Sequence, residues 1–323
     1  MKALVARDYG RPEDLEVVEM PVPTPRPGQI LVRITAASVN ATDLRVVTGF
    51  YREALELTFP YVPGNDFAGT VVEVGDDVRA FAVGDEIFGQ AMHRQLRVVA
   101  APERPSLSTG TLAEYAVFEA DTPMLAHRPA TLSPGDAAAL AIGGMAARSV
   151  MKIAEIKSGE RVLVIGATGG VGTAVIPLLK ATGAVVIATA GTPEGVTVLR
   201  NLGADEVIGF EAEQYPEEVD AVLNLVLFAD QLGSAGQALR AGGRLVSTVV
   251  PAPTPVDLGR DDVEVHFVMD LEGRLGGMPD VAEAAASGLL RATIGATYSL
   301  VEGAAAMADF ARSVTPGKIL VTP

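Results

Sequence analysis

Residues 161–172, Arg-Val-Leu-Val-Ile-Gly-Ala-Thr-Gly-Gly-Val-Gly, constrain the fold more than any other part of this 323-residue chain. The apolar run Val162–Ile165 predicts a buried strand, and the glycines that follow at once permit a tight turn. Residues 172–182 then have the composition of a buried helix. The stretch therefore predicts a strand, a glycine-rich turn and a helix in direct succession.

A unit of this kind presents free backbone N–H groups at the start of its helix. Such groups bind phosphate, and glycines let the backbone approach a pyrophosphate closely. The dinucleotide fingerprint G-x-G-x-x-G is met at Gly169 and Gly172, with Ala167 at the first glycine position. We expect a nicotinamide dinucleotide here, and a tight turn without a ligand is the alternative. The residues expected at the pyrophosphate are Gly166, Ala167, Thr168, Gly169, Gly170, Val171 and Gly172.

The end of the next expected strand, 185–189, bears on which dinucleotide binds. An acidic residue there would bind the 2′-hydroxyl of the adenosine ribose and repel a 2′-phosphate. The chain instead continues through Ala190, Gly191 and Thr192, and its first acid is Glu194. The missing acid favours NADPH, with Thr192 as a hydrogen-bond donor to the 2′-phosphate. No base occurs in this loop, and the next one along the chain is Arg200.

The turn belongs to a longer alternation of strands and helices, which predicts a parallel sheet covered on both faces. Strands are expected at 161–165, 185–189, 206–208, 221–225 and 244–250, with helices at 172–182, 193–202 and 229–240. A helix over 137–151 precedes them, with a cap at Ser133–Asp136 and Pro134 at its first position.

The first 120 residues differ, because short β-forming runs at 30–37, 68–74 and 112–118 are separated by Gly and Pro. This pattern is typical of a barrel or sandwich. Residues 90–110 are expected to form an irregular loop. Near the end of the chain we expect a helix around 301–312 and a strand at 318–321, which can return to either domain.

Composition excludes several kinds of partner. The formal net charge is −15, with 40 acidic against 25 basic residues. Nucleic acids and anionic membranes require a basic face, so neither is expected. The chain has no cysteine, which removes disulfides and thiolate metal ligands. Its N-terminus lacks the apolar run of a secretory signal, and we expect a cytoplasmic protein.

Further motifs occur in a fixed order along the chain, and nearly all of it is covered by them. They are Ala37-Ser38-Val39-Asn40-Ala41-Thr42-Asp43, Pro63-Gly64-Asn65-Asp66-Phe67-Ala68-Gly69, Val83-Gly84-Asp85, Gly110-Thr111-Leu112-Ala113-Glu114-Tyr115, Leu202-Gly203-Ala204-Asp205, Gly242-Gly243-Arg244 and Gly317-Lys318-Ile319. Together with the glycine-rich turn, these resemble the medium-chain dehydrogenase/reductase superfamily. Within it, they are similar to the zinc-independent, quinone oxidoreductase-like branch.

This resemblance implies an α/β fold in which a Rossmann doubly wound parallel sheet is inserted into a GroES-like, β-rich catalytic domain. The implied catalytic domain is residues 1–124 plus 268–323, and the implied Rossmann dinucleotide-binding domain is 125–267. An active site in the cleft between them, NADPH-dependent reduction of a quinone or α,β-unsaturated carbonyl, and a homodimer are also implied.

The resemblance extends the expected cofactor site beyond the turn. The added residues are Asn40, Ala146, Ala190, Gly191, Thr192, Leu225, Val249, Phe267, Met269 and Lys318. For Phe267 and Met269 simple core packing is the alternative. Three positions depart from the branch. Ala146 stands where relatives have Thr, Gly195 where a Lys grips the 2′-phosphate, and Leu227-Phe228 where two glycines are usual.

Metal chemistry is not expected. Zinc alcohol dehydrogenases of the superfamily carry Gly-His-Glu where this chain has Gly64-Asn65-Asp66, and they use cysteine ligands that it lacks. The three histidines, His93, His127 and His266, have no metal-ligand spacing. We therefore expect neither zinc nor another metal.

Without metal or cysteine, the expected chemistry is hydride transfer from a bound nicotinamide to a polarised C=C bond or a quinone. The enolate formed from a conjugated carbonyl needs a hydrogen-bond donor. Asn40 and Tyr51 are the candidates, and Asn40 is favoured because its Val-Asn motif matches the relatives. The alternatives are an Asn40 that stabilises a turn and a Tyr51 that only lines a wall.

Two other functions fit the same residues. An enoyl reductase of a biosynthetic pathway shares the chemistry. A non-catalytic NADPH-binding sensor or regulatory protein would keep the turn and lose the catalytic donors.

Overall fold

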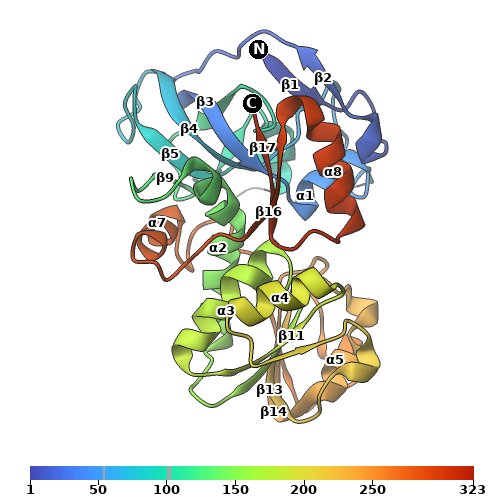
Figure 1. The fold of residues 1–323 in the computed structure, drawn as a ribbon. Coiled ribbons are helices and arrows are strands. Elements are labelled where there is room, and N and C mark those ends of the chain that lie inside the picture. Colours follow the sequence, from blue (N-terminus) through green and yellow to red (C-terminus); the bar gives the residue numbers. More distant parts are fainter. Residues whose placement is uncertain (54, 100–102) are drawn as a thin grey trace. The chain divides into compact units, whose positions relative to one another are not determined.

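The computed structural model describes residues 1–53, 55–99 and 103–323, and the chain folds into two compact units (Figure 1). The first unit comprises Met1–Ile142, Leu271–Gly288 and Ile294–Pro323. The second comprises Gly143–Asp270 and Leu289–Thr293. The chain therefore leaves the first unit, builds the second and returns, as expected for an inserted Rossmann domain.

The second unit is built on a six-stranded parallel sheet. Its strands are β10 (Arg161–Ile165), β11 (Val185–Thr189), β12 (Glu206–Ile208), β13 (Val219–Asn224), β14 (Leu239–Ser247) and β15 (Glu264–Phe267). The order across the sheet is β12-β11-β10-β13-β14-β15, so the direction in which the chain adds strands reverses between β10 and β13. In doubly wound sheets, ligands bind at this reversal, outside the carboxyl ends of the strands.

Helices α3 (Gly170–Thr182), α4 (Pro193–Asn201) and α5 (Gly233–Ala238) follow strands of this sheet. The sequence predicts the bounds of β10, β11 and β12 correctly. The helix expected at 229–240 is wrong. Only a short turn (Ala229–Gln231) and α5 form, because glycine is a poor helix former and Leu239 already pairs with Val219 as the start of β14.

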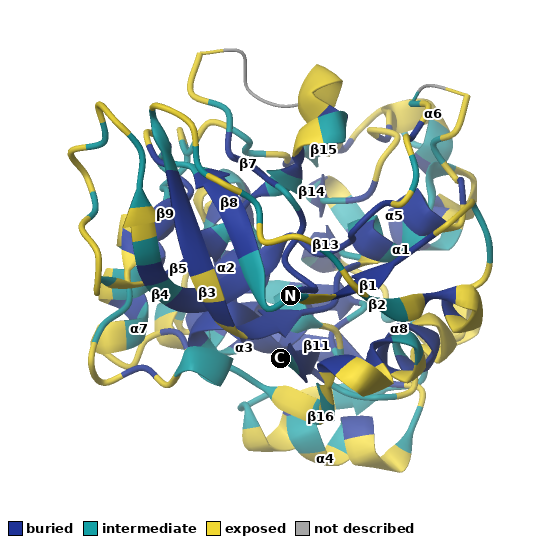
Figure 2. Ribbon diagram, turned by 90° about the horizontal axis from the view of Figure 1, so that it is seen from above, coloured by how far each residue is buried: buried dark blue, intermediate teal, exposed yellow. Residues whose placement is uncertain are grey.

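The first unit holds a nine-stranded, largely antiparallel sheet and a separate strand pair, β1 (Lys2–Val5) with β2 (Glu16–Glu19). The larger sheet contains β3 (Gln29–Ser38), β4 (Asp66–Val74), β5 (Glu86–Gln90), β6 (Met92–His93), β7 (Leu107–Ser108), β8 (Tyr115–Glu119), β9 (Leu125–His127), β16 (Ile294–Ser299) and β17 (Lys318–Thr322). Its helices include α1 (Ala41–Val47), α7 (Met278–Ala286) and α8 (Gly303–Arg312). Figure 2 shows most of β3 and β4 buried.

The C-terminal strand β17 returns to the first unit. It pairs antiparallel with β3, where Leu320 lies opposite Ser38, and parallel with β16. The sequence left open which domain this strand joins, because its apolar run fits either one. Pairing with β3 places Lys318 beside the residues that end that strand.

The unit boundaries differ from those expected. The first falls at 142/143, within α2 (Pro134–Ala154), instead of at 124/125. The reason is that β9 pairs with β5, so this strand belongs to the sheet of the first unit. The return falls at 270/271, and Leu289–Thr293 joins the second unit.

Two local expectations change as well. The helix α1 follows Asn40 directly, although the sequence predicts no helix at this position. Residues 90–110 contain short elements, namely β6, a 3₁₀ helix at Arg94–Val99 and β7, while 100–102 lie outside the described residues.

Among the helices of the described chain, α2 alone is long and apolar enough to cross a membrane by length and composition. Of that apolar window, 67% is buried inside the structure. Residues 162–179 also form a long apolar stretch, and in the structure it divides into β10, the glycine-rich turn and part of α3.

Candidate active site

The glycine-rich turn begins where β10 ends, and two of its glycines are required by the fold. Gly166 has φ +84°, a left-handed conformation that favours glycine. A Cβ at Gly172 would lie 2.4 Å from the carbonyl oxygen of Ala167, so only glycine lets α3 start this close to the turn. Gly169 differs, because a Cβ there would meet only the Gly166 carbonyl oxygen, at 3.5 Å.

Gly169 is exposed and caps α3 with φ −75° and ψ 175°, a conformation open to any residue. The N–H groups of Gly170, Val171 and Gly172 have no partner inside the helix, because they precede its first i−4 carbonyl. No acidic residue lies in this first turn. Open space at Gly169, free N–H groups and the positive end of the helix dipole fit a pyrophosphate.

Neighbouring elements hold the turn in place. The Gly166 N–H donates to the buried Thr189 hydroxyl at the end of β11, at 3.1 Å. Gly143 of α2 lies against the turn from another side, because a Cβ there would be 3.1 Å from the Gly170 carbonyl oxygen. The expected cofactor residue Ala146 is one helical turn further along α2 and is half-buried.

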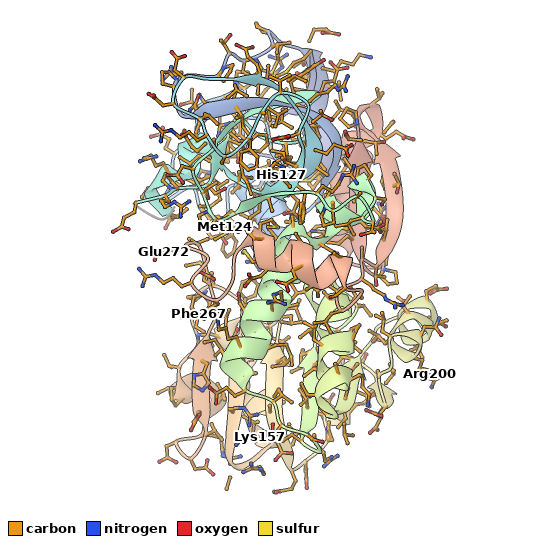
Figure 3. All side chains as sticks on the ribbon, turned by 90° about the vertical axis from the view of Figure 1, so that its left-hand side faces the viewer. Met124, His127, Lys157, Arg200, Phe267 and Glu272 are labelled. Atoms are coloured by element: carbon orange, nitrogen blue, oxygen red, sulfur yellow. The ribbon has the colours of Figure 1, made fainter. Side chains whose placement is uncertain are left out.

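The end of β11 leads into α4 through Ala190, Gly191 and Thr192. Thr192 caps α4, and its hydroxyl oxygen accepts the Gly195 N–H at 3.1 Å. The hydroxyl hydrogen makes no hydrogen bond to another described residue, so it remains available for a ligand. Glu194 is exposed in the first turn of α4. Arg200, labelled in Figure 3, is an exposed residue of the same helix.

The remaining expected residues of this unit lie at the carboxyl ends of other strands. Leu225 follows β13, and its N–H donates to the Ile165 carbonyl at 3.0 Å. Val249 follows β14 and is buried, and Phe267 (Figure 3) is the last residue of β15. Met269 is 58% exposed, which argues against the alternative of core packing for this residue. The sheet therefore brings the turn, Leu225, Val249 and Phe267 to one edge.

In the first unit, Asn40, Asp66 and Lys318 meet in a buried polar cluster. The Lys318 ammonium donates to Asn40 Oδ1 at 2.5 Å, Asp66 Oδ2 at 3.0 Å and the Val39 carbonyl at 3.1 Å. Asp66 Oδ2 also accepts from the Ser38 hydroxyl at 2.7 Å. Lys318 and Asp66 side chains are 6% and 0% exposed, so each charge is compensated inside the protein.

The Asn40 carboxamide is fully used within this cluster. Its two N–H groups donate to Asp66 Oδ2 at 2.9 Å and to the Ser38 carbonyl at 3.3 Å, and its oxygen accepts from Lys318. Asn40 is also the residue before α1. A substrate would have to displace one of these bonds to receive a hydrogen bond from Asn40.

Tyr51 presents the opposite situation. Its side chain is half-buried and packs edge-on against Phe50, with ring centroids 5.0 Å apart. Its hydroxyl donates no hydrogen bond to another described residue. Of the two candidate donors that the sequence suggested, Tyr51 is therefore the one with a free O–H group.

Asp43 lies beside the cluster and is the most perturbed acid of the site. Burial raises the pKa of its carboxyl from 3.8 to about 7, and the nearby Asp66 carboxylate acts in the same direction. The Asn40 N–H, which donates to Asp43 at 2.8 Å, and the Lys318 ammonium oppose this rise of the pKa. Asp43 therefore carries a proton over part of the neutral pH range.

Two buried rings, those of Tyr61 and His93, lie close to one another near Asp43. Burial and the Asp43 carboxylate raise the pKa of Tyr61. Its ring lies 4.5 Å from that of His93, whose pKa burial lowers to about 4. His93 Nδ1 accepts the Gln95 N–H at 3.2 Å, so in the neutral ring the proton is on Nε2.

Sequence reasoning missed Asp66, which the structure places in the buried polar cluster with Asn40 and Lys318. In the sequence, Asp66 was considered only as part of Gly64-Asn65-Asp66, the segment where zinc alcohol dehydrogenases carry Gly-His-Glu. What brings Asn40, Asp66 and Lys318 together is the pairing of β3 with β4 and β17, which links residues 252 positions apart. No local pattern carries that information.

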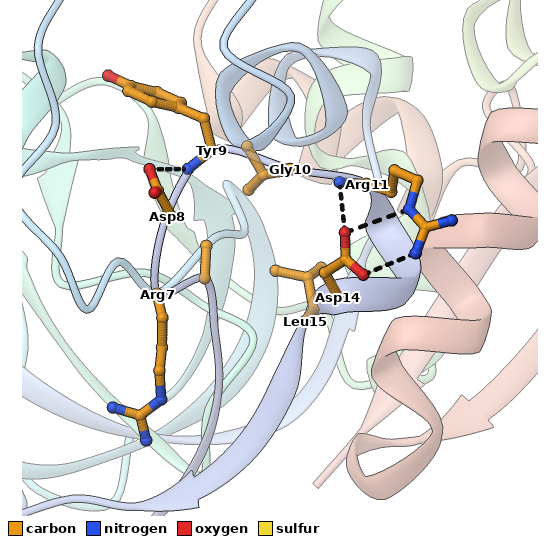
Figure 4. A pocket seen from close by; sticks show the side chains of 9 residues that line it. Arg7, Asp8, Tyr9, Gly10, Arg11, Asp14 and Leu15 are labelled. Carbon is orange, nitrogen blue, oxygen red and sulfur yellow. Dashed lines mark hydrogen bonds and ion pairs between the residues drawn. The ribbon is translucent and has the colours of Figure 1, made fainter.

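Within the described ranges, no group of three or more His, Cys, Asp and Glu residues is placed to hold a metal ion. A separate open pocket lies at the end of β1, lined by residues that include Arg7, Tyr9 and Asp14 (Figure 4). Its lining includes none of the expected site residues. Arg11 and Asp14 there pair with each other at 3.0 Å.

Two family models match the chain. Residues 26–129 match the alcohol dehydrogenase GroES-like domain, and residues 202–321 match the zinc-binding dehydrogenase family. A quinone oxidoreductase of Mus musculus is 32% identical over 275 residues, which cover 81% of this chain and 76% of that protein. An NADPH-dependent alkenal/one oxidoreductase of Arabidopsis thaliana is 32% identical over 79% of this chain and 64% of its own length.

The fold is similarly matched. The solved structure of the quinone oxidoreductase from Coxiella burnetii superposes with a TM-score of 0.86 at 27% identity, covering 100% of this chain and 99% of that one.

Proposed function

Because the chain belongs to the medium-chain dehydrogenase/reductase superfamily, in its quinone oxidoreductase-like branch, we propose that it reduces quinones or α,β-unsaturated carbonyl compounds with NADPH. The observation that carries the proposal is the open turn at Gly169. Space for a ligand, free helix N–H groups and absence of a nearby acid coincide there.

The turn and the ends of the neighbouring strands would hold the dinucleotide. The N–H groups of Gly170–Gly172 would bind the pyrophosphate, and Thr192 would donate its free O–H to the 2′-phosphate. The missing acid after β11 and the NADPH named for the Arabidopsis relative support NADPH over NADH. A bound reduced nicotinamide supplies the hydride for the substrate.

Tyr51 is the proposed catalytic residue. As negative charge develops on the carbonyl oxygen of an enone or quinone, a phenol O–H can donate a hydrogen bond to it and then a proton. Asn40 is proposed as a positioning residue at the start of α1, since its carboxamide is already bonded to Ser38, Asp66 and Lys318.

We also propose catalysis without zinc, although one matching family is named for zinc binding. The support is the absence of cysteine and the presence of Asn65 where a zinc relative has histidine. In addition, the Lys318 ammonium already neutralises Asp66. A homodimer and a cytoplasmic location stay predictions.

A turnover assay tests the proposal. The purified chain should consume NADPH with quinones and with 2-alkenals, and added chelator should leave the rate unchanged. Tyr51→Phe should lower kcat for the enones by about 10²–10⁴-fold, the range for losing a general acid, with little change in NADPH affinity. An unchanged rate in that variant would remove Tyr51 from the mechanism.

One observation favours a non-catalytic alternative. Both N–H groups of the Asn40 carboxamide donate to groups of the protein, so neither is free for a substrate. A protein that binds NADPH without catalysis does not need such a donor. Tight NADPH binding without consumption across the whole panel of quinones and enones would establish this alternative. A biosynthetic enoyl reductase shares the chemistry and differs only in which enone gives the highest kcat/KM.

A further inference from the structure

Asn224, the last residue of β13, is fully buried at the edge of the sheet that carries the glycine-rich turn. In the pairing of β10 with β13, it lies opposite Ile165, the residue directly before Gly166. The strand order reverses between these two strands. Asn224 therefore borders the crevice in which a doubly wound sheet binds its ligand.

The Asn224 carboxamide uses all of its hydrogen-bonding groups to fix the loop that follows. Its oxygen accepts the Leu227 N–H at 2.9 Å and the Val226 N–H at 3.4 Å. Its nitrogen donates to the Leu227 carbonyl at 2.9 Å and to the Ser247 hydroxyl oxygen at 3.0 Å. Ser247 ends β14 and also accepts the Val249 N–H at 3.2 Å.

These bonds define one conformation of residues 225–227 and tie it to the end of β14. Only an amide of this length both donates and accepts in these directions, since a carboxylate has no donor and an aliphatic side chain has neither. A buried polar group with every bond satisfied specifies its surroundings strongly. The Asn224 side chain therefore fixes the conformation of residues 225–227.

The loop meets the glycine-rich turn through Val226. A Cβ at Gly166 would lie 3.0 Å from a methyl carbon of Val226 and 3.4 Å from the Cβ of Leu225. Val226 is nevertheless 43% exposed, so an apolar surface stays open beside the turn. The turn and residues 225–227 are therefore in contact at the edge where the strand order reverses, and residues 225–227 form a wall beside the turn.

The position of the loop indicates which half of a dinucleotide it would contact. In a Rossmann fold the adenosine ribose lies at the end of the second strand, here β11, on the far side of β10. The other half of the dinucleotide therefore extends toward β13 and β14. That is the side on which Asn224 and Ser247 hold the loop.

We propose that Asn224 is a positioning residue for the nicotinamide half of the cofactor, acting through the wall formed by residues 225–227. The inference rests on the proposed dinucleotide function and deepens it. Asn224 itself touches no ligand. It sets where Leu225 and Val226 stand, and these set where the nicotinamide half lies.

Binding of whole and partial ligands tests this role. Calorimetry would compare NADPH with ADP, which carries only the adenosine and pyrophosphate. Asn224→Ala should weaken NADPH at least tenfold (about 1.4 kcal/mol) and leave ADP affinity within about twofold. Ser247→Ala, which removes one partner of the amide, should give a smaller loss in the same direction and is the milder variant if Asn224→Ala folds poorly.

The matched control is Asp220→Ala, at the other end of the same strand. Asp220 accepts the Arg161 N–H at 2.8 Å and a bond from Arg240, so its loss destabilises β13 away from the crevice. NADPH and ADP should bind this variant as they bind the wild type.

The possible results distinguish the positioning role of Asn224 from the proposed dinucleotide function. Unchanged NADPH affinity in Asn224→Ala, or equal losses for NADPH and ADP, overturns the positioning role and leaves the proposed function standing. An NADPH loss in Asp220→Ala as large as in Asn224→Ala likewise shows general destabilisation. Failure of the wild type to bind NADPH at all would instead remove the proposed function.

Discussion

A Cβ at Gly169 would meet only the Gly166 carbonyl oxygen at 3.5 Å, whereas one at Gly172 would lie 2.4 Å from that of Ala167. These two nearby glycines therefore have different roles. Gly172 is needed for α3 to pack on the turn, and the fold alone does not need Gly169. A substitution at Gly169 should therefore affect ligand binding, whereas a substitution at Gly172 should disrupt the fold.

Gly169→Asp should abolish NADPH binding while leaving the melting temperature within a few degrees of the wild type. The side chain fits the unliganded turn, but it fills the phosphate space and adds a negative charge there. Gly233→Asp is the matched control, because a Cβ at this exposed glycine meets nothing within 4 Å. Fluorescence titration and thermal melting check both variants. Retained affinity in Gly169→Asp would contradict the placement of the turn.

Asp43 gives a pH prediction. Its pKa is about 7 in the folded chain against a usual 3.8, so between these values the folded state binds one more proton than the unfolded state. Its contribution to stability therefore falls as pH rises from about 4 to about 7, by an amount on the order of a few kcal/mol.

Asp43→Asn should remove this decline, because an amide does not titrate. Urea unfolding at several pH values would give the free energy of unfolding for both proteins, and their difference isolates Asp43 from every other acid. A difference that stays constant across this pH range would mean that Asp43 ionises normally.

At the scale of elements, the buried cluster depends on three strands and one helix start. β3 ends at Ser38, β4 begins at Asp66 and β17 begins at Lys318. The Lys318 ammonium and the Asp66 carboxylate compensate one another inside the protein, and nearby polar groups complete their hydrogen bonds. Removing one partner leaves a buried charge, which costs about 3–5 kcal/mol.

Lys318→Met should therefore destabilise the first unit by about 3–5 kcal/mol, and adding Asp66→Asn should recover part of that loss. Urea unfolding of the two single variants and the double variant would measure the coupling. Additive losses, with no recovery in the double variant, would show that the pair does not interact as the structure indicates.

Much of the second unit is predictable from the sequence because its elements are local. Val162–Ile165 is a continuous apolar run, and every residue of it is fully buried. The helix expected at 229–240 was wrong because Leu239 is drawn into β14 by its pairing with Val219. That pairing joins distant residues, and the local pattern of apolar residues does not reveal it.

The candidate site divides in the same way. The glycine-rich turn is a contiguous stretch, so its spacing alone suggested a ligand. Asp66 and Asn224 act through bonds to residues far along the chain, and nothing adjacent to either marks such a role. Their contribution needed the fold.

At the scale of the whole molecule, the residues of the turn and strand ends that are proposed to bind the dinucleotide lie in the second unit. Asn40, Tyr51 and Lys318 lie in the first. NADPH at 100 times its Kd should stabilise the unit that binds it by about 2.7 kcal/mol.

Hydrogen exchange should therefore show added protection in β10, the turn and α3 when NADPH is present. Amides of β4 and β5 serve as an internal reference in the first unit. Protection confined to that unit would contradict the assignment of the dinucleotide to the Rossmann sheet.

The antiparallel pairing of β17 with β3 also sets an order of events during synthesis. β3 and β4 are synthesised early, but the end of β3 at Ala37 and Ser38 lacks its partner β17, and Asp66 lacks its counter-charge, until Lys318 has been translated. All of the second unit, through Thr293, is synthesised before that point. The glycine-rich turn proposed to bind the dinucleotide is therefore synthesised before the strand that completes the sheet of the first unit.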